Sequence, residues 1–182
     1  AIAERDFASN GRFRGVKRTA EATGLADASV DLVIAAQAFH WFDRPACARE
    51  WKRILRDAPG GYAAMMWNQR LITTDRFAAE YDELLHRFGT DYKEVAHRTP
   101  MSCDEFSAVF GVPFERISLP NHQSFDFDGL SGRVRSSSYT PLPGQPGHDE
   151  LFAGLRDLFD RYARGGSVRF DYETELFWGK LR

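Results

Sequence analysis

The sequence predicts an α/β fold, built on a mostly parallel sheet whose C-terminal strand runs antiparallel to the others. Two stretches carry this prediction. The nearly continuous aliphatic run over residues 30–34 is typical of a strand buried on both faces of a parallel sheet. Apolar and charged residues alternate strictly over 168–178, which indicates a half-exposed antiparallel strand. Apolar residues recur at helical spacing between these stretches, so helices are expected to connect the strands.

The first 29 residues show little periodicity. After the turn signal Asn10-Gly11, residues 13–17 are expected to form a short strand. A polar segment over 19–25 follows, and its composition is typical of a surface turn in which Thr19 is the capping residue.

The chain changes character where the strand at 30–34 ends. Residues 35–37 are small or polar, so they would let a ligand approach the backbone, and residues 39–42 then bring three aromatic rings and an imidazole. Asp43 is a suitable N-cap, and Pro45 fits the first turn of the helix that the spacing predicts next. In open α/β sheets, ligands bind at this carboxyl end of the strands.

The remaining elements follow from periodicity and from start and stop signals. Ser102 and Glu105 form a capping box for a short helix that ends before Gly111, and Pro120 is expected to end a strand that begins at residue 114. The other expected elements are a strand over 62–67 and helices over 77–88, 128–138 and 151–162.

Composition excludes several classes of protein. The length of 182 residues fits one domain, and a net charge of −2 without a basic run argues against nucleic-acid binding. No apolar stretch approaches the ~20 residues that span a bilayer. Cys47 and Cys103 are too few for a disulfide framework, so a cytoplasmic protein with reduced thiols is expected. Four of the five histidines are scattered without metal-ligand spacing, and no metal site is expected.

The stretch from Ala28 to Asp43, ASVDLVIAAQAFHWFD, resembles the fourth strand and following loop of class I S-adenosylmethionine (SAM)-dependent methyltransferases. It is most similar to the type 11 branch, which includes trans-aconitate-type enzymes. The resemblance continues through residues 51–55, 59–61 and 63–68, which correspond to the family's helix, turn and fifth strand. It implies one domain over 1–182 with a Rossmann-like methyltransferase sheet and a helical cover insertion over about 69–112.

The family also has a preceding βαβ unit, which carries a glycine-rich turn and a ribose-binding acidic residue. No glycine-rich motif occurs in the first 30 residues, and a βαβ unit takes ~30 residues or more. Relative to the family the chain is therefore expected to be truncated at its N-terminus, and SAM binding by these residues alone is expected to be weak. The strand at 30–37 would then have an unpaired edge. We expect this edge to pair with a second copy, or to be covered by the first 28 residues, unless the chain is a fragment.

The resemblance implies a set of site residues at the ends of the predicted strands. The cofactor-binding residues would be Thr19, Ala20, Glu21, Ala36, Gln37 and Phe42. The substrate-binding residues would be Trp41, Trp67, Asn68, Arg135, Ser138 and Tyr139. Among these, Gln37 is supported by its own chemistry, because an amide directly after a buried strand needs a hydrogen-bond partner.

His40 is the candidate catalytic residue, because its pKa lies near neutrality and it follows a strand's carboxyl end. The alternative is that His40 only packs among its aromatic neighbours, since methyl transfer can depend on proximity and orientation alone. Two functions follow from the resemblance. One is SAM-dependent methyl transfer to a small molecule, and the other is a non-catalytic methyltransferase-like module for ligand binding or dimerisation.

Overall fold

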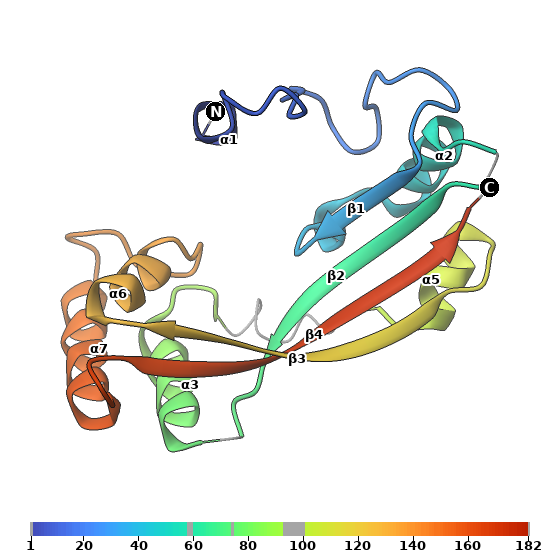
Figure 1. Ribbon diagram of the computed structural model, residues 1–182. Helices are drawn as coiled ribbons and strands as arrows, with labels where there is room; N and C mark the ends of the chain where they lie inside the picture. Colours follow the sequence, from blue (N-terminus) through green and yellow to red (C-terminus); the bar gives the residue numbers. More distant parts are fainter. Residues whose placement is uncertain (1, 58–59, 74, 93–100, 182) are drawn as a thin grey trace. The chain divides into compact units, whose positions relative to one another are not determined.

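The computed structural model describes residues 2–57, 60–73, 75–92 and 101–181 (Figure 1). Its helices are α1 (Ile2–Asp6), η1 (Phe39–Trp41, a 3-10 helix), α2 (Arg44–Ile54), α3 (Arg76–Phe88), α5 (Cys103–Phe110), α6 (Phe127–Arg135) and α7 (His148–Tyr162). Its strands are β1 (Leu32–Ala36), β2 (Tyr62–Arg70), β3 (Glu115–Phe125) and β4 (Val168–Lys180). Within the described ranges, no helix is both long and apolar enough to cross a bilayer.

The chain divides into two compact units. Unit 1 comprises Ala1–Met66, Ser102–Arg116 and Leu176–Arg182, and unit 2 comprises Trp67–Met101 and Ile117–Glu175. Strands β2, β3 and β4 each have residues in both units. The predicted helical cover over 69–112 includes α3, which belongs to unit 2, and α5, which belongs to unit 1; residues 74 and 93–100 of this range lie outside the described residues.

The four strands form one mixed sheet in the order β1-β2-β4-β3. β1 is parallel to β2, whereas β4 runs in the opposite direction (Figure 1). The Leu181 amide donates to the Gly61 carbonyl at 2.8 Å, and the Leu71 amide donates to the Asp171 carbonyl at 2.9 Å, as an antiparallel pair of strands requires. The predicted sheet with a reversed last strand is thereby confirmed.

β1 lies at one edge of this sheet and, among the described strands, pairs only with β2. Leu32 and Ile34 are 48% and 59% exposed. The expected strand over residues 13–17 is not formed, so that prediction was wrong for the described structure. Association of two copies through the β1 edge remains a prediction.

The strand predicted to end at Pro120 continues instead to Phe125. β3 is the opposite edge of the sheet, and its side chains are exposed up to residue 124. A proline is tolerated in an edge strand because its missing N–H can lie on the side that has no neighbouring strand. Sequence alone gave no indication that this strand would be an edge.

Helix boundaries agree with the predicted caps. The Asp43 carboxylate accepts the Ala46 amide at 3.0 Å at the start of α2. Both bonds of the predicted capping box begin α5, because the Ser102 amide donates to the Glu105 carboxylate at 2.7 Å and Ser102 Oγ accepts the Glu105 amide at 3.2 Å. Gly111 ends this helix with a φ of +67°, a conformation that glycine adopts without steric cost.

Each unit has its own core. In unit 1, α2 packs on α5 through an aromatic cluster. In this cluster Phe39 is fully buried and its ring centre lies 5.6–5.9 Å from four other rings, those of Phe42, Trp51, Phe106 and Phe110. In unit 2, α3 and α7 pack on each other and contribute with α6 and β4 to a second core, in which Tyr81, Leu130, Leu155 and Phe170 are fully buried.

Candidate functional site

The carboxyl end of β1 is an exposed, tightly turned segment. Ala36 and Gln37 are exposed, whereas Ala35 beside them is buried. Gln37 has a φ of +52°, which is uncommon for a residue other than glycine, and its amide donates to the Met66 carbonyl at 2.9 Å. This conformation turns the chain out of the sheet at the point where a ligand was predicted.

The aromatic loop after this turn divides into an anchor and an exposed part. Phe39 is the buried anchor, and Phe42 is half-buried, with its ring centre 5.9 Å from that of Phe39. Trp41 is 66% exposed, and the half-buried His40 ring lies 5.0 Å from it between ring centres. The structure therefore places the Trp41 indole, a predicted substrate-binding group, at the surface rather than in the core.

The turn that contains the predicted cofactor-binding residues 19–21 is hydrogen-bonded to α2 and to its N-cap residue. The Glu21 carboxylate accepts the Asp43 amide at 3.1 Å, and the Ala20 carbonyl accepts the indole N–H of Trp51 at 3.3 Å. The pKa of Glu21 is lowered, first by a hydrogen bond from its own amide and then by the Asp43 amide. Thr19 bridges to the residue three positions later in the same turn. The side chain of Glu21 and the carbonyl of Ala20 therefore already have structural partners.

Cys47 lies beside this turn and is fully buried. Burial, followed by the nearby Glu21 carboxylate, raises the pKa of its thiol to about 12. The group is consequently protonated at neutral pH, and it is unsuited to nucleophilic chemistry.

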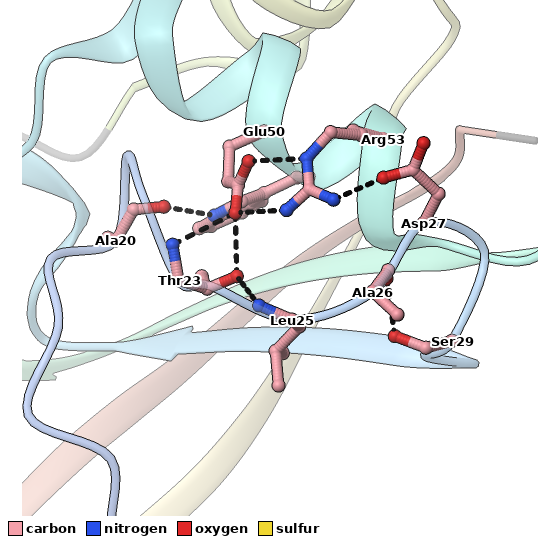
Figure 2. Close-up of polar contacts among 9 residues, drawn as sticks. Ala20, Thr23, Leu25, Ala26, Asp27, Ser29, Glu50 and Arg53 are labelled. Atoms are coloured by element: carbon pink, nitrogen blue, oxygen red, sulfur yellow. Dashed lines mark hydrogen bonds and ion pairs between the residues drawn. The ribbon is translucent and has the colours of Figure 1, made fainter.

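A second set of bonds holds the same segment at the other end of α2, as Figure 2 shows. Glu50, with only 9% exposure, accepts hydrogen bonds from the Thr23 amide at 2.9 Å and the Thr23 hydroxyl at 2.6 Å. Arg53 donates to both carboxylate oxygens of Glu50, at 2.9 and 2.8 Å. These bonds, Arg53 first, lower the pKa of Glu50 to about 2.

Arg53 extends this network to the segment that leads into β1. Its guanidinium also pairs with Asp27 (Figure 2), and its carbonyl accepts the Ala28 amide at 2.9 Å. We had not predicted these residues. A glutamate and an arginine three positions apart on a helix suggest only a local surface pair. Their partners lie more than 20 positions away in the sequence, where no local pattern points to them.

The predicted substrate residues Trp67 and Asn68 lie in unit 2 on β2. Trp67 is 7% exposed, so its indole belongs to the interior. The Asn68 side-chain oxygen accepts the Thr174 hydroxyl at 2.6 Å, and the Thr174 oxygen in turn accepts the Asn121 side-chain amide at 3.2 Å. Asn68 therefore belongs to a polar row that crosses three strands.

The predicted residues after α6 have different surroundings. Arg135 is exposed, with its guanidinium carbon 5.0 Å from the centre of the Phe152 ring, and Ser138 is also exposed. The half-buried Tyr139 packs edge-on against Tyr92, with 4.8 Å between ring centres. Of these three, Tyr139 lies close enough to Arg70 on β2 to act on its charge.

Arg70 of unit 2 is a largely buried cation, and it was not predicted. Its side chain is 12% exposed and donates to the Asp82 carboxylate at 2.7 Å and to the Tyr92 hydroxyl at 2.6 Å. Its guanidinium carbon also lies 4.8 Å from the centre of the Tyr81 ring. An arginine at the end of a strand gives no sequence signal that distinguishes it from a solvated one.

Comparison with known proteins shows a local similarity to methyltransferases. Residues 1–65 match a model described as a methyltransferase domain. Over 52 residues the chain is 48% identical to an uncharacterized methyltransferase of Mycobacterium tuberculosis and 44% identical to an uncharacterized methyltransferase-like protein of Schizosaccharomyces pombe. Each match covers 29% of this chain. The matched segment spans about a fifth of each relative, 21% and 20% of their lengths.

Solved structures share the fold over nearly the whole chain. A proposed type II methyltransferase from Anaeromyxobacter dehalogenans has a TM-score of 0.64 at 22% identity, covering 94% of this chain and 73% of that chain. A proposed methyltransferase from an antibiotic biosynthesis pathway of Anabaena variabilis has a TM-score of 0.54 at 20% identity, covering 93% and 72%. These likenesses confirm the predicted Rossmann-like α/β fold.

Proposed function

We propose that this chain, which is related to the class I SAM-dependent methyltransferases through its first 65 residues and shares their fold, acts in methyl transfer from SAM to a small-molecule acceptor. One observation carries the proposal. The exposed left-handed turn at Gln37 follows a parallel strand within the matched residues, and the aromatic loop with His40 and Trp41 comes directly after it. Ligands of open α/β sheets bind at such a strand end.

The residues at this turn fit part of a SAM site. Ala36 is small and exposed, so a ligand can approach the backbone, and the polar Gln37 side chain is exposed beside it. The turn over 19–21 would lie near the adenine, held in place by the hydrogen bond from the Asp43 amide to the Glu21 carboxylate. When bound, SAM supplies a methyl group activated by a sulfonium centre. Phe42 and Trp41 offer aromatic faces that favour a cation.

Trp41 provides a direct test of cofactor binding at this place. We expect SAM to change the tryptophan fluorescence of the full-length protein, and we expect Trp41→Phe to remove most of the change because this indole is 66% exposed beside the turn. Trp178→Phe is the matched control and should retain the response. A full-length protein that binds no SAM would favour the non-catalytic module.

His40 is proposed as the general base or as the group that orients the acceptor. Its side chain is half-buried, and the fully buried Phe39 anchors the loop independently of it. We therefore expect His40→Ala to lower turnover of the full-length protein by ~10²–10⁴ without changing its melting temperature. His122→Ala, at an exposed position on β3, should change neither quantity. A lower melting temperature with unchanged turnover per folded molecule would instead assign His40 a packing role.

A further inference from the structure

Among the described residues of unit 2, four side chains have buried polar atoms without a hydrogen-bond partner. These atoms are Nε of Arg70 and the hydroxyl oxygens of Tyr81, Ser131 and Tyr172. Tyr81, Ser131 and Tyr172 are 0%, 2% and 4% exposed, and the four residues come from β2, α3, α6 and β4. Folded proteins rarely leave such groups unpaired, because each costs ~1–3 kcal/mol of lost hydration. Four among the described residues of one unit are what a core that holds bound water or a small polar ligand would show.

Two guanidinium groups, those of Arg70 and Arg133, lie over the aromatic ring of Phe170. The guanidinium carbons of Arg70 and Arg133 are 5.8 and 5.4 Å from the centre of the Phe170 ring, and that of Arg133 is 5.6 Å from the centre of the Tyr172 ring. In the described part of the chain, no acidic side chain lies within ion-pair distance of Arg133. We call Arg70, Arg133, Tyr81 and Tyr172 the arginine–tyrosine cluster.

The charge of this cluster is positive. Asp82 is the carboxylate that faces it, and Arg70 and Tyr92 already donate to one oxygen of Asp82, while His86 lies 3.4 Å from the other. Asp82 therefore compensates Arg70 and leaves Arg133 without a counter-charge among the described residues. An uncompensated cation beside unpaired hydroxyl groups is complementary to an anion.

The cluster is not sealed from solvent. Arg133 is half-buried and its guanidinium also donates to the exposed Gln123 side chain, at 3.4 Å. Tyr139, one of the predicted substrate residues, is also half-buried and acts electrostatically on Tyr81 and Tyr172. A small ligand would reach the buried groups from this side.

We propose that the arginine–tyrosine cluster binds the oxyanion of a small ligand that carries a carboxylate or phosphate group. The two guanidinium groups supply charge and directed N–H donors, which is the combination that recognises carboxylate and phosphate groups.

The tyrosines are in the correct protonation state for this role. Burial raises the pKa of Tyr81 to about 12 and raises that of Tyr172 as well. Arg133 lies close to both hydroxyl groups and opposes this rise in pKa, but burial has the larger effect. Both phenols keep their protons at neutral pH, so each has an O–H to donate to an anion.

Calorimetric titration of the protein without SAM tests the inference. The probes are succinate, inorganic phosphate and uncharged succinamide, all at constant ionic strength. We expect at least one of the two anions to bind and succinamide not to bind. Binding of succinate alone identifies a carboxylate site, binding of phosphate alone identifies a phosphate site, and binding of both identifies a general oxyanion site.

Variants locate the binding. Arg133→Met is expected to weaken anion binding by ~10-fold or more, because a charge-assisted hydrogen bond is lost. Arg87→Met is the matched control, since Arg87 is exposed in the same unit with its guanidinium carbon 5.0 Å from the Phe88 ring centre, and it should bind the anion as the native protein does.

Tyr81→Phe and Tyr172→Phe separate a ligand site from a packed core. Each removes an unpaired hydroxyl, so the melting temperature without ligand should stay equal or rise, while anion affinity falls by ~10-fold. The inference is overturned if neither anion binds, if succinamide binds as well as succinate, or if affinity is unchanged in Arg133→Met. It is also overturned if Arg135→Met loses the anion while Arg133→Met retains it.

These outcomes are independent of methyl transfer. Anion binding without SAM-dependent turnover would retain the site and overturn the proposed function. If the protein catalyses SAM-dependent methyl transfer but the arginine–tyrosine cluster does not contribute to anion binding, the proposed function is retained and the anion site is overturned.

Discussion

Replacing Phe39 by alanine is expected to lower the free energy of unfolding by ~3–5 kcal/mol, since the side chain is fully buried and its removal leaves a cavity. Its ring contacts Trp51 on α2 and Phe106 and Phe110 on α5. To fill the cavity left by its removal, either helix would have to give up other packing contacts. The same change removes the anchor of the His40 loop. Urea unfolding followed by near-ultraviolet circular dichroism would measure the effect.

Trp41→Ala is the control for the Phe39 variant. It removes a larger aromatic side chain two positions away in the same loop. Because Trp41 is 66% exposed, the free energy of unfolding should change by no more than ~0.5 kcal/mol. Equal losses of stability in the two variants would contradict the division of the loop into a buried anchor and an exposed part.

The second large effect is expected at Glu50. Glu50→Gln removes the charge that accepts hydrogen bonds from Thr23 and Arg53, and a loss of ~1–3 kcal/mol is expected at neutral pH. The pKa of about 2 in the folded chain is below the ordinary value of 4.5. The stabilisation by Glu50 is therefore fully present above pH ~4.5 and is lost as the pH falls toward 2.

Urea unfolding at a series of pH values would measure this dependence. The native protein and Glu50→Gln should converge in stability as the pH falls from ~4.5 toward 2, because protonation makes the two side chains similar. Glu83→Gln, at an exposed position on α3, should follow the native curve throughout. A constant difference between native protein and Glu50→Gln over this range would contradict the role assigned to the charge.

The elements that could be predicted are those whose determinants lie within a few residues. Asp43 caps α2 by accepting an amide three positions later, and the alternation that predicts β4 lies within the strand itself. The course of β3 past Pro120 could not be predicted in this way. Whether a proline is tolerated depends on the position of the strand in the sheet, and that order is set by the whole chain.

The polar residues of the candidate sites were harder to predict for the same reason. The stretch at 36–42 follows a recognisable strand, so the sequence identifies it. Glu50 binds a residue 27 positions away, and Arg70 and Arg133 meet over a ring on β4. Charged side chains are usually at the surface, and only the packing of distant elements shows which of them are buried.

The two fastenings of α2 have a consequence for the kinetics of local opening. Glu21 holds the turn to the first residue before α2, and Glu50 holds the same segment to the last turn of that helix. Because the two sets of bonds lie only two positions apart in the segment, at Glu21 and Thr23, the segment detaches from α2 only when both sets break. Fluctuations of the turn and of α2 are thus a single cooperative event. A ligand that touches only the turn would slow amide exchange along the whole helix.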